Sequence, residues 1–539
     1  MQYHGAMKPF DPAQPFAAQR PPVLARNLVA CSQPLAAQAG LQMLARGGNA
    51  IDAALAAAIA LTVVEPTMNG IGGDGFSLIW DGSRLHGLNA SGRAPAAWTP
   101  ARFAGMTRMP PIGWDTVTVP GAVSQWVQLS ERFGALPFAD LFEPAIRYAT
   151  DGFAVSPVIA RQWAAAADSP LAAQPGFAQA FTRDGRAPRV GERWTFAAQA
   201  RTLADIAATH GESFYRGRLA GLIADWAQRT GGAITGEDLA AHQAEWVEPI
   251  RIDYRGYTLH EIPPNGSGVA ALIALGVLER LPVAQTRPGS AERLHLQIEA
   301  MRLAFADAHA FVGEPAAMRV GVSDLLDPDY LASRAALVDP QRAGLPGPGA
   351  PSGGTVYLCA ADAQGRMVSL IQSNYHGFGS GVVVPDTGIA LHNRGLGFKL
   401  IPGHPDEVGP GKRPFHTILP AFITRGDAPV MAFGVMGGNM QPQGHVQIAM
   451  RYLDDGLNPQ ACSDAPRWRI DDQGQLLVEA AMPAETIAGL RERGHDVEVR
   501  PADSLDFGSC QAIARLSADL ADGYVAGSDH RRDGQAVGF

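Results

Sequence analysis

Cysteine is scarce in this chain of 539 residues, which contains only four of them. Cys31, Cys359, Cys462 and Cys510 lie far apart in the sequence and form no Cys-x-x-Cys pair. They provide neither the dense disulfide framework of a small secreted protein nor the ligand spacing of a structural zinc site. The pattern is typical of a reduced protein, and we expect it to be cytoplasmic.

Long apolar runs and concentrations of one charge are also missing. The apolar stretch AALAAAIALTVV at 53–64 is shorter than the roughly 18 residues that a membrane-spanning helix needs. The first 22 residues include no continuous apolar segment, so we expect no secretory signal. The net charge is −9 and no run of lysine and arginine occurs, which argues against nucleic acid and membrane surfaces as partners.

A glycine-rich motif, GIGGDG at 70–75, connects an expected helix to an expected strand. Ala/Leu-rich segments predict helices at 35–46 and 49–63, and the motif follows the second of them. A phosphate-binding loop has the opposite order, because it follows a strand and opens a helix. We therefore interpret these glycines as positions of close backbone approach or positive φ, and not as a dinucleotide site.

The segment RAGLPGPGAPSGG at 342–354 separates two regions of different character. Its proline and glycine content is typical of a linker and not of a packed element. Residues 121–330, which precede it, are expected to be mostly helical. An amphipathic helix within 293–313 places four apolar residues on one core-facing side: Leu294, Ile298, Met301 and Phe305.

Strand-like sequence begins directly after the linker. Residues 355–374 (TVYLCAADAQGRMVSLIQSN) predict two antiparallel strands joined by a DAQGR turn. Such a hairpin brings Thr355 and Ser373 to neighbouring strand ends, within reach of a hydrogen bond. The other expected elements of this region are strands at 381–384, 418–424 and 430–434 and a helix at 443–454.

Thr355 stands where the linker meets the first of these strands. A threonine hydroxyl is a weak nucleophile unless a base lies beside it. A threonine that begins a chain carries its own base, the α-amino group, whose pKa is about 8. If the bond between Gly354 and Thr355 is cut, Thr355 becomes such a residue. Otherwise Gly-Gly-Thr is only a loop that ends at a strand.

Motifs along nearly the whole chain resemble those of the γ-glutamyltransferase family of N-terminal nucleophile hydrolases. Residues 28–81 resemble the family's N-terminal signature, and FGVMGG at 433–438 matches its double-glycine motif. Four further matches follow in the family's order: TVPGAV at 118–123, EPIRIDYRGYTLHEIPPNGSG at 248–268, MRLAFADAHAFVGEP at 301–315 and VGPGKRPFHTILP at 408–420.

The resemblance implies an α+β fold, the four-layer αββα sandwich of N-terminal nucleophile hydrolases. It also implies a precursor that cleaves itself between Gly354 and Thr355 into a large fragment, 1–354, and a small fragment, 355–539. The two interlocked fragments are expected to form a heterodimer, with a dimer of such heterodimers left open. The implied partner is a small-molecule amide substrate, and neither a cofactor nor a metal is expected.

The resemblance also assigns catalytic roles. Thr355 matches the nucleophile, and Ser373 stands where the family has a threonine that hydrogen-bonds to it. Serine keeps that hydroxyl, although a solvated serine at a strand end is the alternative interpretation. Gly437 and Gly438 match the glycines of the oxyanion hole, where backbone N–H groups stabilise the developing negative charge.

The match fails at positions that hold the γ-glutamyl group in glutathione-using members of the family. Ser91 occupies the place of the arginine that binds the α-carboxylate, and Arg93 lies two residues later. Tyr375 and Gly397 replace the asparagine and the aspartate that hold the α-ammonium. An asparagine can be replaced by another hydrogen-bonding group, but glycine cannot supply the negative charge of an aspartate.

Arg394 stands where glutathione-using members have a neutral side chain, and His416 and Thr417 replace their paired serines. The site thus loses an anion and gains a cation, which favours an acyl group with a free carboxylate, because a guanidinium binds it bidentately. A surface ion pair is the alternative for Arg394. His376, His392 and His416 are too scattered, and too short of carboxylate partners, to predict a metal site.

One branch of the family shares IQS.YH.FGSGVV, NRG, RPFHT and MGG..QPQ with this chain, and it includes oxamate amidohydrolase. We therefore expect hydrolysis of a small carboxylate-bearing amide such as oxamate through an acyl-enzyme, and glutaryl-type amides are a further option. Two other functions stay open: a γ-glutamyltransferase or glutathione hydrolase, and an unprocessed binding protein without catalysis. The residues expected to contact the substrate are Arg93, Tyr375, Arg394, His416 and Thr417.

Overall fold

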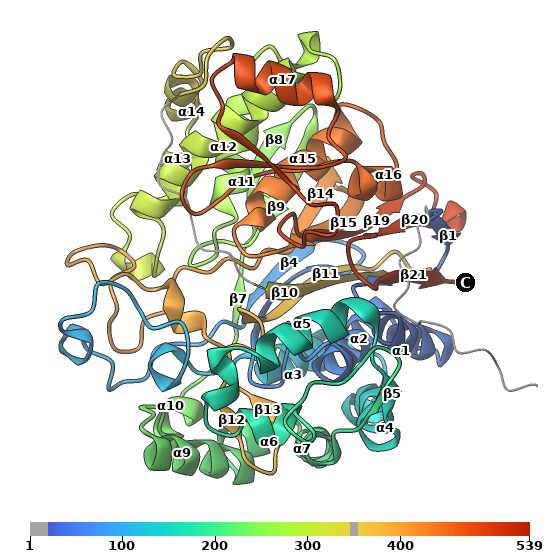
Figure 1. Ribbon diagram of the computed structural model, residues 1–539. Helices are drawn as coiled ribbons and strands as arrows, with labels where there is room; N and C mark the ends of the chain where they lie inside the picture. Colours follow the sequence, from blue (N-terminus) through green and yellow to red (C-terminus); the bar gives the residue numbers. More distant parts are fainter. Residues whose placement is uncertain (1–19, 345–353) are drawn as a thin grey trace, which may run out of the picture.

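Two seven-stranded sheets lie face to face in the middle of the molecule (Figure 1). The computed structural model describes residues 20–344 and 354–539. The first sheet has the order β1 (Val23–Ala25), β20 (Tyr524–Ser528), β19 (Ser509–Arg515), β15 (Ala428–Met436), β14 (Ala421–Arg425), β9 (Tyr257–Glu261) and β8 (Ile250–Tyr254). The second has the order β21 (Gln535–Gly538), β2 (Leu28–Cys31), β10 (Gly354–Ala361), β11 (Met367–Tyr375), β3 (Asp74–Trp80), β4 (Leu85–Asn89) and β7 (Glu245–Val247).

Helices cover the outer face of each sheet. Those on the first sheet, in the upper part of Figure 1, are α11 (Val269–Leu278), α12 (Ala291–Phe311), α15 (Met440–Leu453), α16 (Pro459–Asp464) and α17 (Ala484–Glu492). Those on the second are α1 (Pro34–Ala45), α2 (Ala50–Val64), α3 (Ala122–Phe133), α4 (Glu143–Asp151), α5 (Pro157–Ala167) and α7 (Ala197–Ala208). This order of layers confirms the predicted αββα sandwich of the α+β class.

Smaller elements extend both helical layers. Above the first sheet these are α13 (Val322–Leu325), α14 (Pro328–Ala335) and a small sheet of β16 (Trp468–Ile470), β17 (Leu476–Glu479) and β18 (Val497–Arg500). Below the second they are α6 (Phe177–Phe181), α8 (Glu212–Tyr215), α9 (Arg218–Thr230), α10 (Gly236–Ala240) and the pairs β5 (Phe153–Ala154) with β6 (Arg193–Trp194) and β12 (Val383–Val384) with β13 (Ile389–Ala390).

β10 is buried on both faces, because it lies in an inner layer of the sandwich. Its side chains alternate, as the period of two in a strand requires. Val356 and Leu358 join the core between the second sheet and its helices. Tyr357 and Cys359 join the core between the two sheets. A strand in this position therefore carries an almost uninterrupted apolar sequence.

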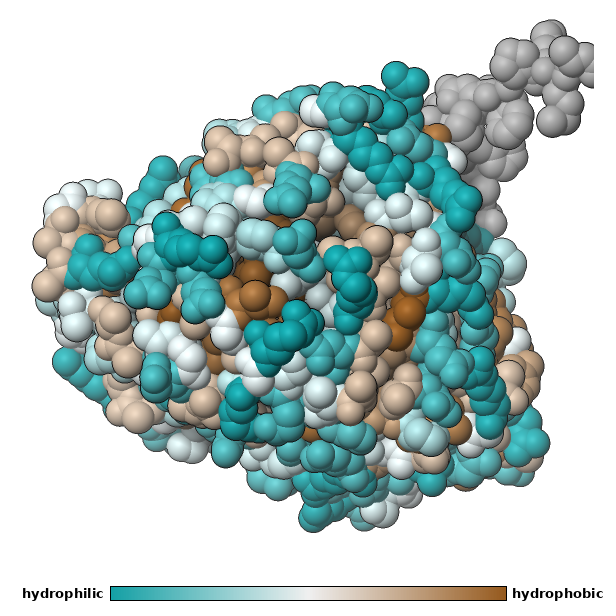
Figure 2. Space-filling view, turned by 90° about the horizontal axis from the view of Figure 1, so that it is seen from below, coloured by the Kyte–Doolittle hydropathy of each residue, from teal (hydrophilic) through white to brown (hydrophobic). Residues whose placement is uncertain are grey.

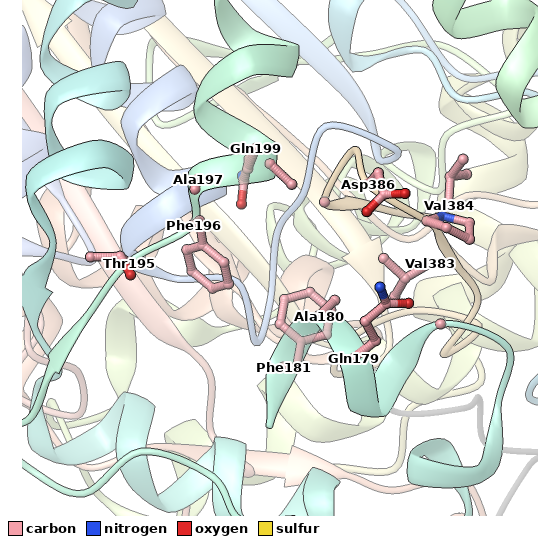
Figure 3. Close-up of a pocket in the computed structure, with 14 residues that line it drawn as sticks. Gln179, Ala180, Phe181, Thr195, Phe196, Ala197, Gln199, Val383, Val384 and Asp386 are labelled. Atoms are coloured by element: carbon pink, nitrogen blue, oxygen red, sulfur yellow. The ribbon is translucent and has the colours of Figure 1, made fainter. Parts of the chain in front are cut away.

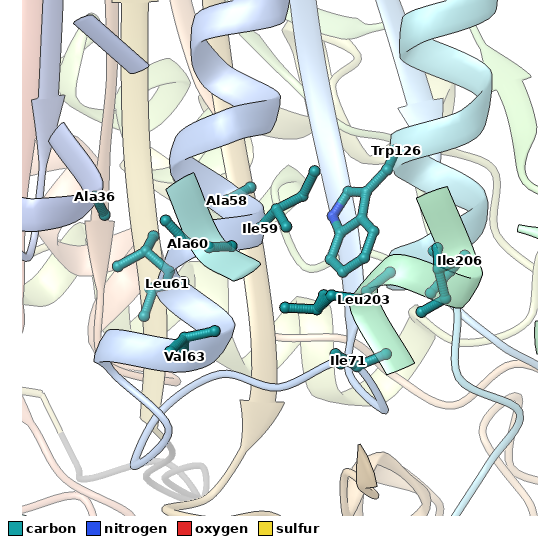
Figure 4. Close-up of a cluster of buried hydrophobic side chains, with 14 of the residues drawn as sticks. Ala36, Ala58, Ile59, Ala60, Leu61, Val63, Ile71, Trp126, Leu203 and Ile206 are labelled. Carbon is teal, nitrogen blue, oxygen red and sulfur yellow. The ribbon is translucent and has the colours of Figure 1, made fainter. Parts of the chain in front are cut away.

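α2 is the most deeply buried helix beside the second sheet, and all 15 of its residues are buried. Its N-terminus is closed by a capping box in which the Asn49 side chain and the Asp52 carboxylate each accept a backbone N–H of the other. Its small alanines let neighbouring elements approach closely from every side. Figure 4 shows Ile59 of α2 pointing toward Trp126 of α3 and Leu203 of α7, whereas Leu61 points to the other side of the helix.

The face of the molecule seen from below is largely hydrophilic (Figure 2). Apolar residues come to this surface only as small, separate areas between hydrophilic ones. Among residues 20–344 and 354–539, no helix combines the length and the apolar character that a membrane crossing requires.

Most of the elements predicted from the sequence are present within one to three residues. The helices expected at 35–46 and 49–63 are α1 and α2, and the hairpin after the linker is β10 and β11. The helix expected at 443–454 starts three residues earlier, at Met440. The region 121–330 is less uniformly helical than predicted, because β7, β8 and β9 lie within it. Of the predicted linker, residues 345–353 lie outside the described part of the chain.

Both large sheets combine strands from the two sides of Thr355. In the first sheet, β1, β8 and β9 precede Thr355 in sequence and the other four strands follow it. In the second, β10 pairs with β2 on one side and with β11 on the other, and β11 pairs with β3. The segments before and after Thr355 therefore share both large sheets, and neither segment contains either of these sheets complete.

Candidate active site

Thr355 lies at the beginning of β10, next to the end of β11. The antiparallel register places Gly354 opposite Tyr375, with an irregularity between Gly354 and Val356. Thr355 Oγ1 is 3.2 Å from Ser373 Oγ, and both side chains are fully buried. Ser373 Oγ also accepts a hydrogen bond of 2.7 Å from the Tyr375 backbone N–H. The hairpin thus brings the two predicted hydroxyl groups into contact, and Ser373 is not a solvated residue.

α15 contributes a further group that reaches Thr355. Gln441 Nε2 donates to Thr355 Oγ1 over 3.4 Å, and Gln441 Oε1 accepts a hydrogen bond of 2.7 Å from Leu419 N. The second bond fixes the orientation of the amide, because only its oxygen can accept. Sequence analysis missed Gln441, although it is the first glutamine of the MGG..QPQ motif.

Gly437 and Gly438 form a tight turn between β15 and α15. Their φ angles are 124° and 60°, a region that favours glycine. A Cβ atom at Gly437 would also lie only 3.0 Å from the Cα of Gly508. The Gly437 and Gly438 carbonyls accept from Met440 N and Gln441 N, so this turn leads directly into the N-terminus of α15. Backbone N–H groups at such a helix start favour negative charge.

A buried cluster of charged and polar groups, centred on Asp74, adjoins the hairpin. β3 pairs with β11 in a register that places Asp74 opposite Ser373. Asp74 Oδ2 lies 2.6 Å from His416 Nε2, 3.3 Å from Arg394 Nε and 3.4 Å from His392 Nδ1. All four of these side chains are fully buried. We call them the Asp74 cluster.

The charges in the Asp74 cluster follow from the surroundings of each group. Burial opposes ionisation of Asp74, but the Arg394 guanidinium and the imidazoles of His416 and His392 outweigh it and hold the pKa of Asp74 well below its usual range. Burial, together with the positive charge of Arg394, lowers the pKa of His416 to about 4. His416 is therefore neutral at pH 7, and Asp74 and Arg394 form a buried ion pair.

Tyr375 separates Arg394 from the space outside the Asp74 cluster. The Arg394 guanidinium lies 4.3 Å from the centre of the Tyr375 ring, a cation–π contact. Arg394 Nη1 also donates to Thr417 Oγ1 over 3.2 Å. Tyr375 has a φ of 74°, which costs about 1–3 kcal/mol for a residue with a bulky side chain and persists only where the surroundings fix it.

The GIGGDG motif packs against the end of β11 and against the segment that leads to Arg394. A Cβ atom at Gly72 would lie 2.3 Å from the Ala390 carbonyl oxygen, and one at Gly73 would lie 2.6 Å from that of Ser373. Neither glycine has a positive φ. Of the two predicted reasons for glycine here, close backbone approach is therefore the correct one. Asp74 follows directly and points into the cluster.

A pocket of about 550 Å³ lies beside Tyr375, Thr417 and Asn439. Its wall is mainly apolar, with Met109, Leu396, Phe398, Leu400, Ile401 and Phe415. Arg108 also lines this pocket, is exposed, and forms no hydrogen bond or ion pair within residues 20–344 and 354–539. Burial raises the pKa of the neighbouring Asp406 well above its usual range, which disfavours its negative charge. The pocket therefore offers an unpaired positive charge on an apolar wall.

A second pocket, of about 200 Å³, lies between α6, the start of α7 and the β12–β13 pair (Figure 3). The rings of Phe181 and Phe196 and the side chains of Val383 and Asp386 line it. Gln199, which also lines it, already donates to the Thr62 carbonyl over 2.8 Å. None of the residues predicted for catalysis or substrate binding belongs to its wall.

The structure does not bring Arg93 to the Asp74 cluster. The Arg93 side chain is 41% exposed, and its guanidinium forms ion pairs with Glu245 at 3.0 Å and Glu314 at 3.4 Å. Arg394 is not in a surface ion pair, because it is fully buried. The cation that motif comparison assigned to the site is instead paired with a buried anion, Asp74, which that comparison did not consider.

The histidines also differ from expectation. His392 and His416 are not scattered, because both approach the same carboxylate oxygen of Asp74. His376 lines the pocket instead, where burial lowers its pKa to about 4. This arrangement arises because β3 pairs with β11 and because the distant segment 392–416 folds back to the same strand end. Asp74 was therefore visible in the sequence only as an acidic residue within a glycine motif.

Known proteins are similar to this chain over nearly its whole length. The family model described as Gamma-glutamyltranspeptidase matches residues 36–539. The chain is 40% identical over 522 residues to the oxamate amidohydrolase proenzyme of Klebsiella pneumoniae, covering 94% of this chain and 97% of that protein. It is 37% identical over 523 residues to the glutathione hydrolase-like YwrD proenzyme of Bacillus subtilis, covering 95% of this chain and 98% of that one.

Among solved structures, the cephalosporin acylase from Bacillus halodurans superposes with a TM-score of 0.93 and 48% sequence identity, covering 99% of both chains. The relatives are named as hydrolases, amidohydrolases and acylases, so the enzyme class is shared across the comparison. The matches extend over Thr355 and over both sheets. The chain is therefore an enzyme of the gamma-glutamyltranspeptidase family.

Proposed function

We propose that the chain cleaves itself before Thr355 and then acts as an N-terminal-threonine amidohydrolase. The observation that carries this proposal is the contact of 3.2 Å between Thr355 Oγ1 and Ser373 Oγ in a buried hairpin. A buried threonine hydroxyl with two hydrogen-bonding partners, Ser373 and Gln441, is oriented before any substrate arrives. The relatives of known name are proenzymes, which supports cleavage.

In the cleaved enzyme, the free α-amino group of Thr355 accepts the proton of Oγ1 while that oxygen attacks the amide carbon. The carbonyl oxygen becomes negatively charged and is stabilised by the N–H groups of Gly437 and Gly438. The tetrahedral intermediate collapses when the C–N bond breaks and the amine leaves with the proton. Water then attacks the Thr355 ester, the same amino group accepts its proton, and the acid is released.

The substrate is proposed to be an amide whose acyl part carries a free carboxylate. The Arg93 and Arg394 charges are already matched by acidic residues, and the ammonium of Lys399, which also lines the pocket, donates to the His309 carbonyl over 2.7 Å. Arg108 is therefore the cation that a substrate carboxylate meets at the pocket. Burial raises the pKa of Asp406 and so disfavours an opposing negative charge on the same wall.

The size of the pocket favours a second candidate, an acylase for a larger carboxylate-bearing amide. A volume of about 550 Å³ exceeds what oxamate, a molecule of a few atoms, fills, and apolar side chains line most of it. The cephalosporin acylase from Bacillus halodurans, at 48% identity, points the same way. A glutaryl amide combines a carboxylate with an apolar spacer and serves as its test substrate.

A γ-glutamyl substrate is disfavoured by Gly397. A Cβ atom at this position would lie 2.4 Å from the Phe415 carbonyl oxygen, so an aspartate that could hold an α-ammonium does not fit there. Glutathione hydrolysis therefore needs an anion elsewhere in the pocket, and burial disfavours the negative charge of Asp406, the acidic residue of the pocket wall. Glutathione is accordingly the comparison substrate.

The processing is tested on a denaturing gel. Scaling the 56.8 kDa of the chain by residue number gives fragments of about 37 and about 20 kDa, and the smaller should begin Thr-Val-Tyr-Leu. Thr355→Ala should remain one inactive chain, because it lacks the hydroxyl for both reactions. Thr355→Ser retains a hydroxyl and should still be cut. Full activity of an uncut chain would refute the proposal.

The substrate class is tested by kcat/KM for oxamate, a glutaryl amide and glutathione, measured side by side. Arg108→Ala should raise KM for the carboxylate-bearing amides by about fivefold to about 100-fold, the range between an exposed and a buried charge-assisted contact. Arg102→Ala is the matched control, because that neighbouring arginine pairs with Asp115 at 2.7 Å and does not line the pocket. Equal kinetics of Arg108→Ala and wild type would remove Arg108 from the substrate site.

A further inference from the structure

A second group of buried titratable side chains lies in the helical layer outside the first sheet, apart from Thr355. His295 and Glu299 are one turn apart on α12, and His495 lies in the turn between α17 and β18. Each offers one ligand atom, and these three atoms lie within 4.8 Å of one another. The side chains are between 0% and 6% exposed. In Figure 1, α12 and α17 lie side by side at the top of the molecule.

The hydrogen bonds of His295 leave one of its ring nitrogens available as a ligand. His295 Nε2 lies 2.8 Å from the Asp339 carbonyl oxygen, which can only accept, so Nε2 carries the proton. Nδ1 therefore presents a lone pair, and it faces His495 Nε2 at 2.8 Å. A ring N–H donated to a backbone carbonyl is the arrangement that orients metal-binding histidines.

Two buried atoms in the same place, Glu299 Oε1 and His495 Nδ1, have no hydrogen-bond partner among residues 20–344 and 354–539. Glu299 Oε2 accepts a hydrogen bond of 2.8 Å from Gly344 N, so the carboxylate is already oriented by its other oxygen.

We propose that His295, Glu299 and His495 bind a divalent transition metal of the zinc class. Two imidazoles and one carboxylate suit zinc better than calcium or magnesium, which prefer oxygen ligands only. Binding moves the proton of His495 from Nε2 to the unpartnered Nδ1, so no net proton is released. The two facing nitrogens separate from 2.8 Å to about 3.3 Å, as metal–nitrogen bonds of about 2.0–2.1 Å in a tetrahedral site require.

The surroundings set the limits of this site. Arg302 Nε lies 3.7 Å from Glu299 Oε1, and the Arg302 side chain moves away from this oxygen when a cation binds. Three protein ligands leave one position for water. Gly494 and Asp496, the chain neighbours of His495, are exposed. The site therefore lies just beneath the surface, and the path of an ion to it is short.

The location gives the metal a structural role. His295 and Glu299 belong to the segment before Thr355, and His495 belongs to the segment after it. Gly344 N and Ala343 N are held by Glu299 and by the Arg493 carbonyl, so the last described residues before 345 are fixed beside the site. The metal thus joins the two segments. A role of the metal in holding two separate fragments together rests on the proposed cleavage. The binding of the metal does not depend on that cleavage.

The test uses the purified protein, freed of metal by a chelator and titrated with Zn²⁺ against a chromophoric indicator. One ion per chain is expected, together with a rise of the thermal unfolding midpoint. His495→Gln and Glu299→Gln should each weaken binding by about 100-fold or more, since even the loss of an outer-shell partner costs about 10–100-fold. His260→Gln is the matched control, because His260 is buried, contacts Thr424 Oγ1 at 2.9 Å and lies on β9.

The outcomes separate this proposal from the proposed function. Absence of stoichiometric Zn²⁺ binding to the wild-type chain overturns the metal site, whether or not the chain is cleaved or active. Binding that persists unchanged in both ligand variants overturns the assignment of the residues. The uncut Thr355→Ala chain should bind Zn²⁺ like wild type. It therefore reports on the metal site even if the proposed cleavage fails.

Discussion

Replacing Asp74 by asparagine removes the negative charge of the Asp74 cluster and preserves the size of the side chain. Arg394 would then be a fully buried cation without an ionic partner. At 3.3 Å and an effective dielectric constant of about 20, the attraction between the two charges amounts to about 5 kcal/mol. Removal of one partner of a buried pair costs about 3–5 kcal/mol in other proteins. We expect Asp74→Asn to lose about 3–5 kcal/mol of unfolding free energy.

The measurement is urea unfolding at pH 7 in a Thr355→Ala background, because a chain that stays in one piece gives a concentration-independent transition. Asp427→Asn is the control, since Asp427 is an exposed turn residue. Its variant should stay within about 0.5 kcal/mol of the parent. Raising the salt concentration from 0.1 to 1 M should leave the loss in Asp74→Asn almost unchanged, because buried pairs are screened little.

The dependence on pH provides a second check. The native pKa of Asp74 lies below its unfolded value of about 3.9, so the stabilisation is fully present above that pH. It is lost only as the pH falls through the lower native pKa. The gap between parent and Asp74→Asn should therefore be constant from pH 5 to 8 and narrow below pH 4. A gap under about 1 kcal/mol, or one that salt abolishes, would refute a buried ion pair with Arg394.

Three further expectations follow from the same contacts. Ser373→Ala should lower kcat about fivefold to tenfold with little change in KM, because one hydrogen bond of about 1 kcal/mol to the nucleophile is lost. Gly72→Ala should destabilise the chain in urea unfolding, since its Cβ would lie 2.3 Å from the Ala390 oxygen, whereas Gly236→Ala, which meets nothing within 4 Å, should be neutral. The native pKa of His416, about 4, lies below its unfolded value of about 6.5, so protonation of His416 favours unfolding. As the pH falls from 6.5 to 4, the unfolding free energy of the parent should therefore drop by up to about 3 kcal/mol more than that of His416→Gln.

Local patterns were sufficient to predict the hairpin and its two hydroxyl groups. The distance between Thr355 and Ser373 depends only on a short turn between adjacent strands, and strand periodicity reports it directly. The same holds for the amphipathic face of α12, whose four predicted apolar residues are all buried. Contacts of this kind are short in sequence, and no knowledge of the tertiary arrangement is needed to find them.

The partners of Arg394 could not be predicted in this way. Asp74 precedes Arg394 by 320 residues, and the two meet only because β3 pairs with β11 and residues 392–416 return to the same strand end. Whether a charged residue is buried depends on that return as well. For this reason motif comparison assigned Arg394 to the substrate, whereas in the structure it lies behind Tyr375. For the same reason Arg108, which lines the pocket, was not considered.

The distribution of strands across both sheets has a consequence for how the molecule can be built. Neither the part before Thr355 nor the part after it contains either large sheet complete, so each would expose unpaired strand edges if it were synthesised separately. Two genes that encode the parts would have to yield polypeptides that fold upon each other, at a rate that depends on concentration. A single gene whose product is cut after folding replaces this encounter with an intramolecular one.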